Sequence, residues 1–273
     1  MTATSPTVTA AAPPAALEAR GVERSLPLGG GIVHILRGVD LRIERGQLAA
    51  LVGPSGSGKS TLLGVIAGLD RPSAGRVLVD GIDITDMPES RLAAVRNAKI
   101  GMVFQAFNLI PTLTAQENVE VPLYVGEHPG SPSSRAREML ALVGLEHRLG
   151  HRPNQLSGGE QQRVAMARAL ATAPAIVIAD EPTGNLDAAN GERILELIVE
   201  LRRQTGTTFL IATHDPTIAG RAEVIHTIVD GQLVRSAGAD EWRPYARHAV
   251  DTGSESEVDD DASSGSRRQR VRT

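Results

Sequence analysis

Residues 53–61 read Gly53-Pro54-Ser55-Gly56-Ser57-Gly58-Lys59-Ser60-Thr61. The run fits G-x-x-x-x-G-K-[ST], with an apolar strand pattern before it and a helical pattern after it, as this motif requires. Glycines let the backbone turn tightly enough for successive N–H groups to face phosphate oxygens, and the helix N-terminus adds positive charge. Every residue of the run except Pro54 is expected at the phosphates, with Lys59 on the β- and γ-phosphates and the Ser60 hydroxyl on Mg²⁺.

We call this run, residues 53–61, the P-loop. The sequence on either side of it alternates between apolar strands and amphipathic helices. Strands are expected at 47–52, 175–179 and 209–213, and helices at 62–69 and 194–205. Such alternation is typical of a parallel sheet covered by helices. The pattern predicts an α/β fold of the P-loop NTPase class, with a RecA-like parallel sheet at its centre.

Two tight turns and one helical stretch depart from this alternation. Asp80-Gly81 and Asp230-Gly231 each separate two short apolar runs, which is the signal of a two-residue β-hairpin turn. The section from about 108 to 158 is mostly helical. We therefore expect an antiparallel β subdomain and an inserted helical subdomain beside the parallel core.

Composition limits the classes of protein to consider. Hydrophobic residues make up 41% of the 273 residues, and there are no cysteines, which removes disulfides, thiolate metal sites and cysteine nucleophiles. The net charge of −4 shows no basic footprint, so no nucleic-acid partner is expected. No apolar run approaches the roughly 18 residues that cross a bilayer.

The two ends differ in composition from the middle of the chain. Residues 1–16 are rich in Ala, Thr and Pro without a basic start, so we expect neither a secretory signal nor order there. Residues 237–273 run from an acidic, Ser-rich stretch to a basic end, and are also expected to be disordered. Residues 17–236 are predicted to form the folded nucleotide-binding domain.

A pair of acidic residues follows one of the buried strands. Asp180 and Glu181 come directly after the apolar run 176–179, at the carboxyl edge where a parallel sheet places groups that handle ligands. Asp180 is expected to hold Mg²⁺, and Glu181 to polarise the water that attacks the γ-phosphate.

A second phosphate cradle is predicted at the run Leu156-Ser157-Gly158-Gly159-Glu160-Gln161-Gln162-Arg163. A hydroxyl and two glycines expose backbone N–H groups at the start of a helix, which suits an anion. One nucleotide has no evident use for both cradles of one chain, so a facing second copy of the domain explains the pair.

These motifs, in this order over about residues 17–235, resemble the ABC ATPase family. The resemblance implies ATP as substrate, Mg²⁺ as cofactor, and an ATP sandwich in which Ser157, Gly158 and Gly159 contact ATP held by a second copy of the chain. It also assigns Gln105 to the Q-loop, which helps to bind Mg²⁺ and senses a transmembrane partner. By the same resemblance, Asp187 belongs to the D-loop, and His214 is the switch histidine that contacts the γ-phosphate, acting with Glu181 and Lys59.

One position departs from the family. The family usually places an aromatic side chain near the start of the domain to stack on adenine, and Leu26 aligns with that position. Stacking on a base is worth on the order of 1–3 kcal/mol. We therefore expect weaker discrimination between bases here.

Residues 96–123 and the run 182–187 resemble one branch of the family, the lipoprotein-release and macrolide-exporter type. This resemblance implies a homodimer that drives a separate integral membrane permease, located in the cytoplasm on the inner face of the cell membrane. Non-transport roles stay open: mechanical signalling in cell division, or a soluble ATPase associated with DNA or translation. The absence of a heptad stretch argues against the DNA-associated role, and the absence of a second cassette argues against the translation-associated role.

Overall fold

The computed structural model describes residues 14–126, 128 and 130–242. Most of each predicted terminal segment therefore lies outside the described residues. Ala15 and Ala16, which come just before the first strand, are buried, and Trp242 packs on the core. No helix among the described residues is both long and apolar enough to cross a membrane.

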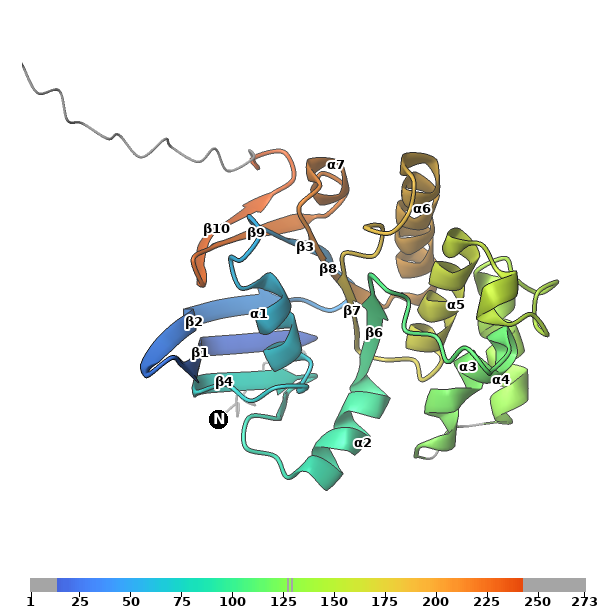
Figure 1. Ribbon diagram of the computed structural model, residues 1–273, viewed down its shortest axis with the longest axis horizontal. Helices are drawn as coiled ribbons and strands as arrows, with labels where there is room; N and C mark the ends of the chain where they lie inside the picture. The colour runs from blue at the N-terminus through green and yellow to red at the C-terminus, as the bar shows by residue number, and fades with distance from the viewer. Residues whose placement is uncertain (1–13, 127, 129, 243–273) are drawn as a thin grey trace, which may run out of the picture.

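A six-stranded sheet forms the centre of the molecule, in the order β10-β9-β3-β8-β7-β6 (Figure 1). Its strands are β3 (Leu48–Val52), β6 (Ile100–Phe104), β7 (Ile176–Asp180), β8 (Thr208–Thr213), β9 (Val224–Val229) and β10 (Gln232–Gly238). The five strands from β9 to β6 are parallel, and β10 pairs antiparallel at the edge. Because β3 and β8 are covered on both faces, every residue in them is buried, as their unbroken apolar sequences require.

A smaller antiparallel sheet lies beside the central one, in the order β2-β1-β4-β5. Its strands are β1 (Leu17–Leu28), β2 (Gly31–Ile43), β4 (Ala74–Val79) and β5 (Ile82–Asp83). This sheet is the predicted antiparallel subdomain.

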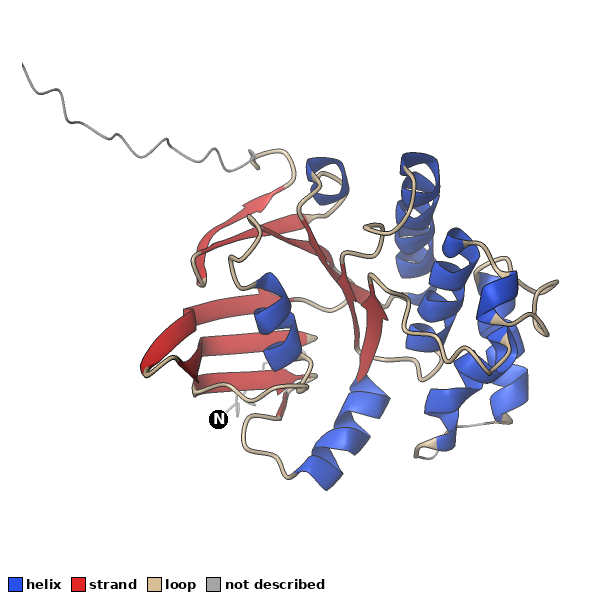
Figure 2. Cartoon of the chain, viewed as in Figure 1, coloured by secondary structure: helices blue, strands red, loops and turns tan. Residues whose placement is uncertain are grey.

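The helices are divided between the two faces of the central sheet (Figure 2). They are α1 (Lys59–Ile66), α2 (Glu89–Lys99), α3 (Ala115–Glu120), α4 (Pro132–Leu142), α5 (Gly158–Leu170), α6 (Ala188–Thr205) and α7 (Pro216–Ala219), with 3₁₀ turns η1 (Val121–Tyr124) and η2 (Pro153–Gln155). Helix α1 packs between the two sheets, whereas α3 to α6 lie on the opposite face. The predicted α/β fold of the P-loop class, with its antiparallel and helical subdomains, is confirmed.

Both Asp-Gly turns form as predicted. Asp80 and Gly81 have φ of 53° and 79°, and Asp230 and Gly231 have φ of 47° and 77°, the conformation that such hairpin turns demand. The first helix is shorter than predicted. It ends at Ile66 because Gly68 turns the chain at φ 66°, and Leu69 is left 55% exposed instead of packing with the helix.

Candidate functional site

The P-loop connects the end of β3 to α1, and its glycines are needed for two different reasons. A Cβ on Gly53 would lie 2.2 Å from the Ile228 carbonyl oxygen, so no side chain fits there. Gly56 and Gly58 have φ of 78° and 100°, a backbone conformation that residues with a Cβ rarely adopt. The loop therefore holds its backbone in one curved path against β9.

Lys59 opens α1, and its side chain folds back over the loop. It is buried, and its Nζ donates hydrogen bonds to the carbonyl oxygens of Gly53 (2.8 Å) and Pro54 (3.1 Å). Burial lowers the pKa of the Lys59 ammonium, while the nearby charges of Glu181 and Asp180 act in the opposite direction. The lysine and both acidic residues thus share one electrostatic environment.

The structure joins Ser60 to Asp180. Burial raises the pKa of the Asp180 carboxyl, and the nearby Ser60 side chain opposes this rise. Two oxygen-bearing groups that are distant in the sequence therefore meet where β7 ends and α1 begins.

Glu181 follows β7 in a constrained backbone conformation. Its φ is 45°, unusual for a residue with a side chain, and its N–H donates to the Ala212 carbonyl oxygen of β8 at 3.0 Å. Its Oε1 lies 3.1 Å from Nδ1 of His214, which follows β8 and is 68% exposed. The neighbouring strands thus bring the predicted base and the predicted switch histidine together.

Gln105 comes directly after β6, and its amide lies against the turn that follows Glu181. Its Nε2 donates to Oδ1 of Asn185 at 3.3 Å, and Asn185 Nδ2 donates to the Gln105 carbonyl oxygen at 2.9 Å. A Cβ on Gly184 would lie 2.7 Å from the Gln105 amide nitrogen, so this glycine makes room for the glutamine.

The second predicted cradle stands at the start of α5. Ser157 caps the helix: its Oγ accepts from the Glu160 N–H at 3.3 Å, and the Glu160 carboxylate accepts from the Ser157 N–H at 2.8 Å. The bond from the Ser157 N–H is the main reason that the pKa of Glu160 is lowered. Gly159 faces Asn190, whose backbone N–H is capped by Asp187, so the second cradle and the predicted D-loop residue lie together.

The two cradles lie on opposite faces of the central sheet. The P-loop and α1 face the antiparallel sheet, whereas α5 and its N-terminus are on the side of α6 (Figure 1). Among the described residues, no hydrogen bond or ion pair joins Ser157, Gly158 or Gly159 to the P-loop.

Residues 36–184 match the profile of the family described as ABC transporter. The chain belongs to the ABC transporter family. It is an ATPase subunit of that family, and the described fold and motifs fit this assignment.

Known relatives of this ABC ATPase extend along most of its length. The lipoprotein-releasing system ATP-binding protein LolD of Bacteroides fragilis is 45% identical over 205 residues, covering 75% of this chain and 95% of that protein. The macrolide export ATP-binding/permease protein MacB of Marinobacter nauticus is 44% identical over 225 residues, 82% of this chain but 35% of that protein. The resemblance to the lipoprotein-release and macrolide-exporter branch is thereby confirmed.

A solved structure gives the same result. The ATP-binding cassette MJ0796 of Methanocaldococcus jannaschii, described as a dimer in a post-hydrolysis state bound to ADP and Pi, superposes with a TM-score of 0.74 at 44% identity. The match covers 82% of this ABC ATPase and 98% of that chain.

Leu26, the predicted base-stacking position, lies on the antiparallel sheet and not on the central one. It lies on β1 opposite Val33 of β2 and is 38% exposed. The P-loop of this ABC ATPase contacts β2 through Gly58, which lies beside Ile35 and Leu36. Among the described residues, no hydrogen bond joins Leu26 to the P-loop.

Sequence analysis did not single out two residues that hold the Gln105 loop. Asn185 is bonded to Gln105 itself, and the Arg168 guanidinium donates to the carbonyl oxygens of Asn108 (2.6 Å) and Phe107 (3.0 Å). Phe107 and Asn108 both have positive φ. A Phe-Asn pair after a strand is a weak turn signal, and nothing in the sequence pairs it with an arginine on α5.

Proposed function

We propose that two copies of this chain close over two ATP molecules and that closure drives a separate membrane permease. Each ATP is held by Lys59 and Ser60 of one copy and by Ser157, Gly158 and Gly159 of the other. Asp187 lies beside the second cradle and belongs to the same dimer interface.

The observation that carries this proposal is the separation of the two cradles within one chain. Helices α1 and α5, which follow the two cradles, pack on opposite faces of the central sheet, and this favours a nucleotide held between two copies. The dimeric MJ0796 cassette, with which the chain superposes, supports an arrangement in which a second copy supplies the missing cradle.

Hydrolysis is assigned to Glu181, His214 and Lys59. The Glu181 carboxylate takes a proton from the attacking water, and its constrained backbone fixes where that carboxylate points. His214 lies within hydrogen-bond distance of Glu181, and it is assigned the contact with the γ-phosphate. Lys59 stabilises the negative charge that develops on the phosphate oxygens.

The donor set beside the P-loop fits Mg²⁺. The Ser60 hydroxyl lies near the Asp180 carboxyl and affects its pKa, and Gln105 follows Phe104, which pairs with Asp180 at the same edge of the sheet. Hard oxygen ligands of this kind suit magnesium, which also keeps waters and phosphate oxygens in its shell. When bound, the ion neutralises charge on the β- and γ-phosphates.

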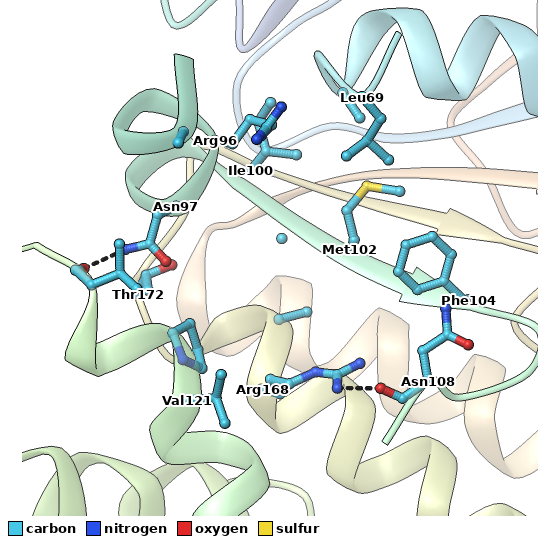
Figure 3. Close-up of a pocket in the computed structure, with 16 residues that line it drawn as sticks. Leu69, Arg96, Asn97, Ile100, Met102, Phe104, Asn108, Val121, Arg168 and Thr172 are labelled. Atoms are coloured by element: carbon cyan, nitrogen blue, oxygen red, sulfur yellow. Dashed lines mark hydrogen bonds between the residues drawn. The ribbon is translucent and has the colours of Figure 1, made fainter. Parts of the chain in front are cut away.

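The permease is proposed to dock in an apolar groove whose lining includes Phe104, the residue before Gln105 (Figure 3). A cavity of about 490 Å³ lies where α2, β6 and α5 meet. Its lining includes Leu69, Met102, Phe104, Val121 and Arg168. Because β6 ends at Phe104, a helix that pushes on this groove moves the residue next to Gln105. The exposure of Leu69 has its explanation in this contact.

A role in lipoprotein release or in export follows from the named relatives, LolD and MacB. We place the chain on the inner face of the cell membrane, held there by the permease. The cargo is selected by that partner.

The test is to purify tagged Glu181→Gln protein with ATP and Mg²⁺ from detergent-solubilised membranes and to identify what is recovered with it. Removing the base blocks hydrolysis and holds the closed dimer, so a stoichiometric integral membrane protein is expected. Recovery of a soluble dimer alone would move the assignment to a non-transport ABC role. Hydrolysis by Glu181→Gln at the wild-type rate would show that Glu181 is not the base.

A further inference from the structure

Gln162 carries a buried side-chain amide of which only the nitrogen makes a hydrogen bond among the described residues. It lies on α5, it is completely buried, and its Nε2 donates to the carbonyl oxygen of Pro182 at 2.6 Å. Its Oε1 is also buried and has no hydrogen-bond partner among the described residues. The orientation of the amide follows from chemistry, because a carbonyl oxygen can be met only by the NH₂ group.

This arrangement is poor for stability. A buried acceptor without a partner costs free energy, and an apolar side chain of the same shape avoids that cost. A methionine at position 162 would fill the same space among the apolar residues of the core. Methionine would, however, leave the buried Pro182 carbonyl oxygen without its donor, so the use of glutamine here is to hold that peptide.

The acceptor lies in the turn that holds Glu181. Gly184 donates its N–H to the Glu181 carbonyl oxygen at 3.0 Å, closing a turn in which Pro182 is the second residue. Glu181 enters this turn at φ 45°, and Gly184 leaves room for the amide of Gln105. Fixing the Pro182 peptide thus fixes the backbone on which the predicted base stands.

Helix α5 itself is held firmly against the core. A Cβ on Gly101 of β6 would lie 2.4 Å from the Ala169 carbonyl oxygen, so helix and strand touch backbone to backbone. The preceding residue, Arg168, donates to the carbonyl oxygens of Phe107 and Asn108, which follow Gln105 in the chain. The same helix thus carries the cradle at Ser157 and contacts both the Glu181 turn and the Gln105 loop.

We propose that Gln162 is a positioning residue for ATP hydrolysis. Its bond to Pro182 holds the Glu181 turn in register with the helix that begins at Ser157, so the base is aligned when that helix is seated against the opposing copy. The inference rests on the proposed role of Glu181.

The test is the Gln162→Met variant of the full chain, assayed for ATP hydrolysis and thermal unfolding. We expect kcat to fall by about tenfold while KM for ATP stays within about twofold, because only alignment of the base is lost. The melting temperature is expected to change little, because the unpaired Oε1 is removed while the Pro182 carbonyl oxygen loses its donor. Gln204→Met, at an exposed glutamine on α6, is the control and should leave all three quantities unchanged.

A second variant tests the hydrogen bond itself. In Gln162→Glu, burial favours the protonated carboxyl, which can donate to Pro182, whereas the ionised form cannot. The ratio of its kcat to that of wild type should therefore rise as the pH is lowered. A ratio that does not change with pH, or a Gln162→Met variant with wild-type kcat, overturns the proposal.

Failure of the inference can be told apart from failure of the underlying assignment. If Glu181→Gln abolishes hydrolysis and Gln162→Met does not reduce it, the base assignment stands and the role of Gln162 falls. If Glu181→Gln retains hydrolysis, the base assignment falls first. A Gln162→Met variant that loses kcat together with a lower melting temperature identifies a structural residue and overturns the proposal.

Discussion

Gln105 and Asn185 hold each other in both directions across 80 residues of sequence. The Gln105 side chain donates to the Asn185 side chain at 3.3 Å, and the Asn185 side chain donates to the Gln105 carbonyl oxygen at 2.9 Å. Both residues are exposed. The pair, which we call the latch, therefore joins two surface loops by hydrogen bonds and is not part of the core.

Replacing Asn185 with alanine should slow hydrolysis. The change removes both hydrogen bonds and frees the Gln105 amide, and one hydrogen bond is worth about 1 kcal/mol in stability. We expect kcat to fall between about threefold and tenfold, with the melting temperature nearly unchanged. Asn154→Ala, at an exposed asparagine of η2, should leave kcat at the wild-type value; an equal loss in both variants contradicts the latch.

Leu26→Tyr should strengthen nucleotide binding. An aromatic ring at this exposed position on β1 supplies the adenine stacking that leucine lacks, worth on the order of 1–3 kcal/mol. Calorimetry should show the dissociation constant for ATP falling by about tenfold and the preference for ATP over GTP increasing.

The matched control is Ile32→Tyr. Ile32 is 68% exposed on β2 and, because side chains alternate along a strand, it lies on the other face from Val33, the partner of Leu26. If both tyrosines improve affinity equally, or Leu26→Tyr leaves affinity unchanged, Leu26 does not occupy the base-stacking position.

His226 should make the fold sensitive to acid. It is buried on β9 with Nδ1 2.8 Å from the Ser236 hydroxyl, and burial lowers its pKa from 6.5 to about 4. Between these pH values His226 is therefore protonated in the unfolded chain and neutral in the folded chain. The associated stability is present above pH 6.5 and is lost as the pH falls toward 4.

Lowering the pKa by this amount corresponds to about 3 kcal/mol. Urea unfolding at several pH values should show that His226→Gln lacks this part of the acid slope. His147→Gln, at an exposed histidine, should keep it. An unchanged slope in His226→Gln would assign the acid sensitivity to other groups.

Two glycines near the nucleotide site should respond oppositely to alanine. Gly53→Ala places a methyl group 2.2 Å from the Ile228 carbonyl oxygen, so the loop must move and ATP binding should be lost. Gly64 lies inside α1 with open space where a Cβ would be. Gly64→Ala should raise the free energy of unfolding by about 0.5–1 kcal/mol, measured by urea titration, with ATP affinity preserved.

Local chemistry explains which elements could be predicted from the sequence. Asp80-Gly81 and Asp230-Gly231 form the predicted turns because their positive φ values depend on the residues themselves. β1 and β2 were not delimited, because both are half exposed and β1 is interrupted by bulges after Ala19, Val22 and Arg24. The apolar pattern predicts that Leu69 lies on the first helix, but α1 ends at Ile66, before Gly68 turns the chain.

The predicted site residues stand in motifs that the sequence displays, whereas the residues that support them could not be predicted. Lys59 and Glu181 stand in runs whose spacing is informative, but Asn185, Arg168 and Gln162 act through contacts between segments far apart in the chain. An isolated glutamine in a helix looks like any polar surface residue. Its burial appears only when α5 is packed against the sheet.

Trp242 gives the protein a reporter of its own. It is the single tryptophan of the chain, and it stands where the described residues end, packed against the core on the helical side. With two tyrosines besides, ultraviolet emission excited at the red edge of the absorption band comes from one place in the molecule. A change in the packing of Trp242 against the core can therefore be followed by fluorescence, without attaching a dye.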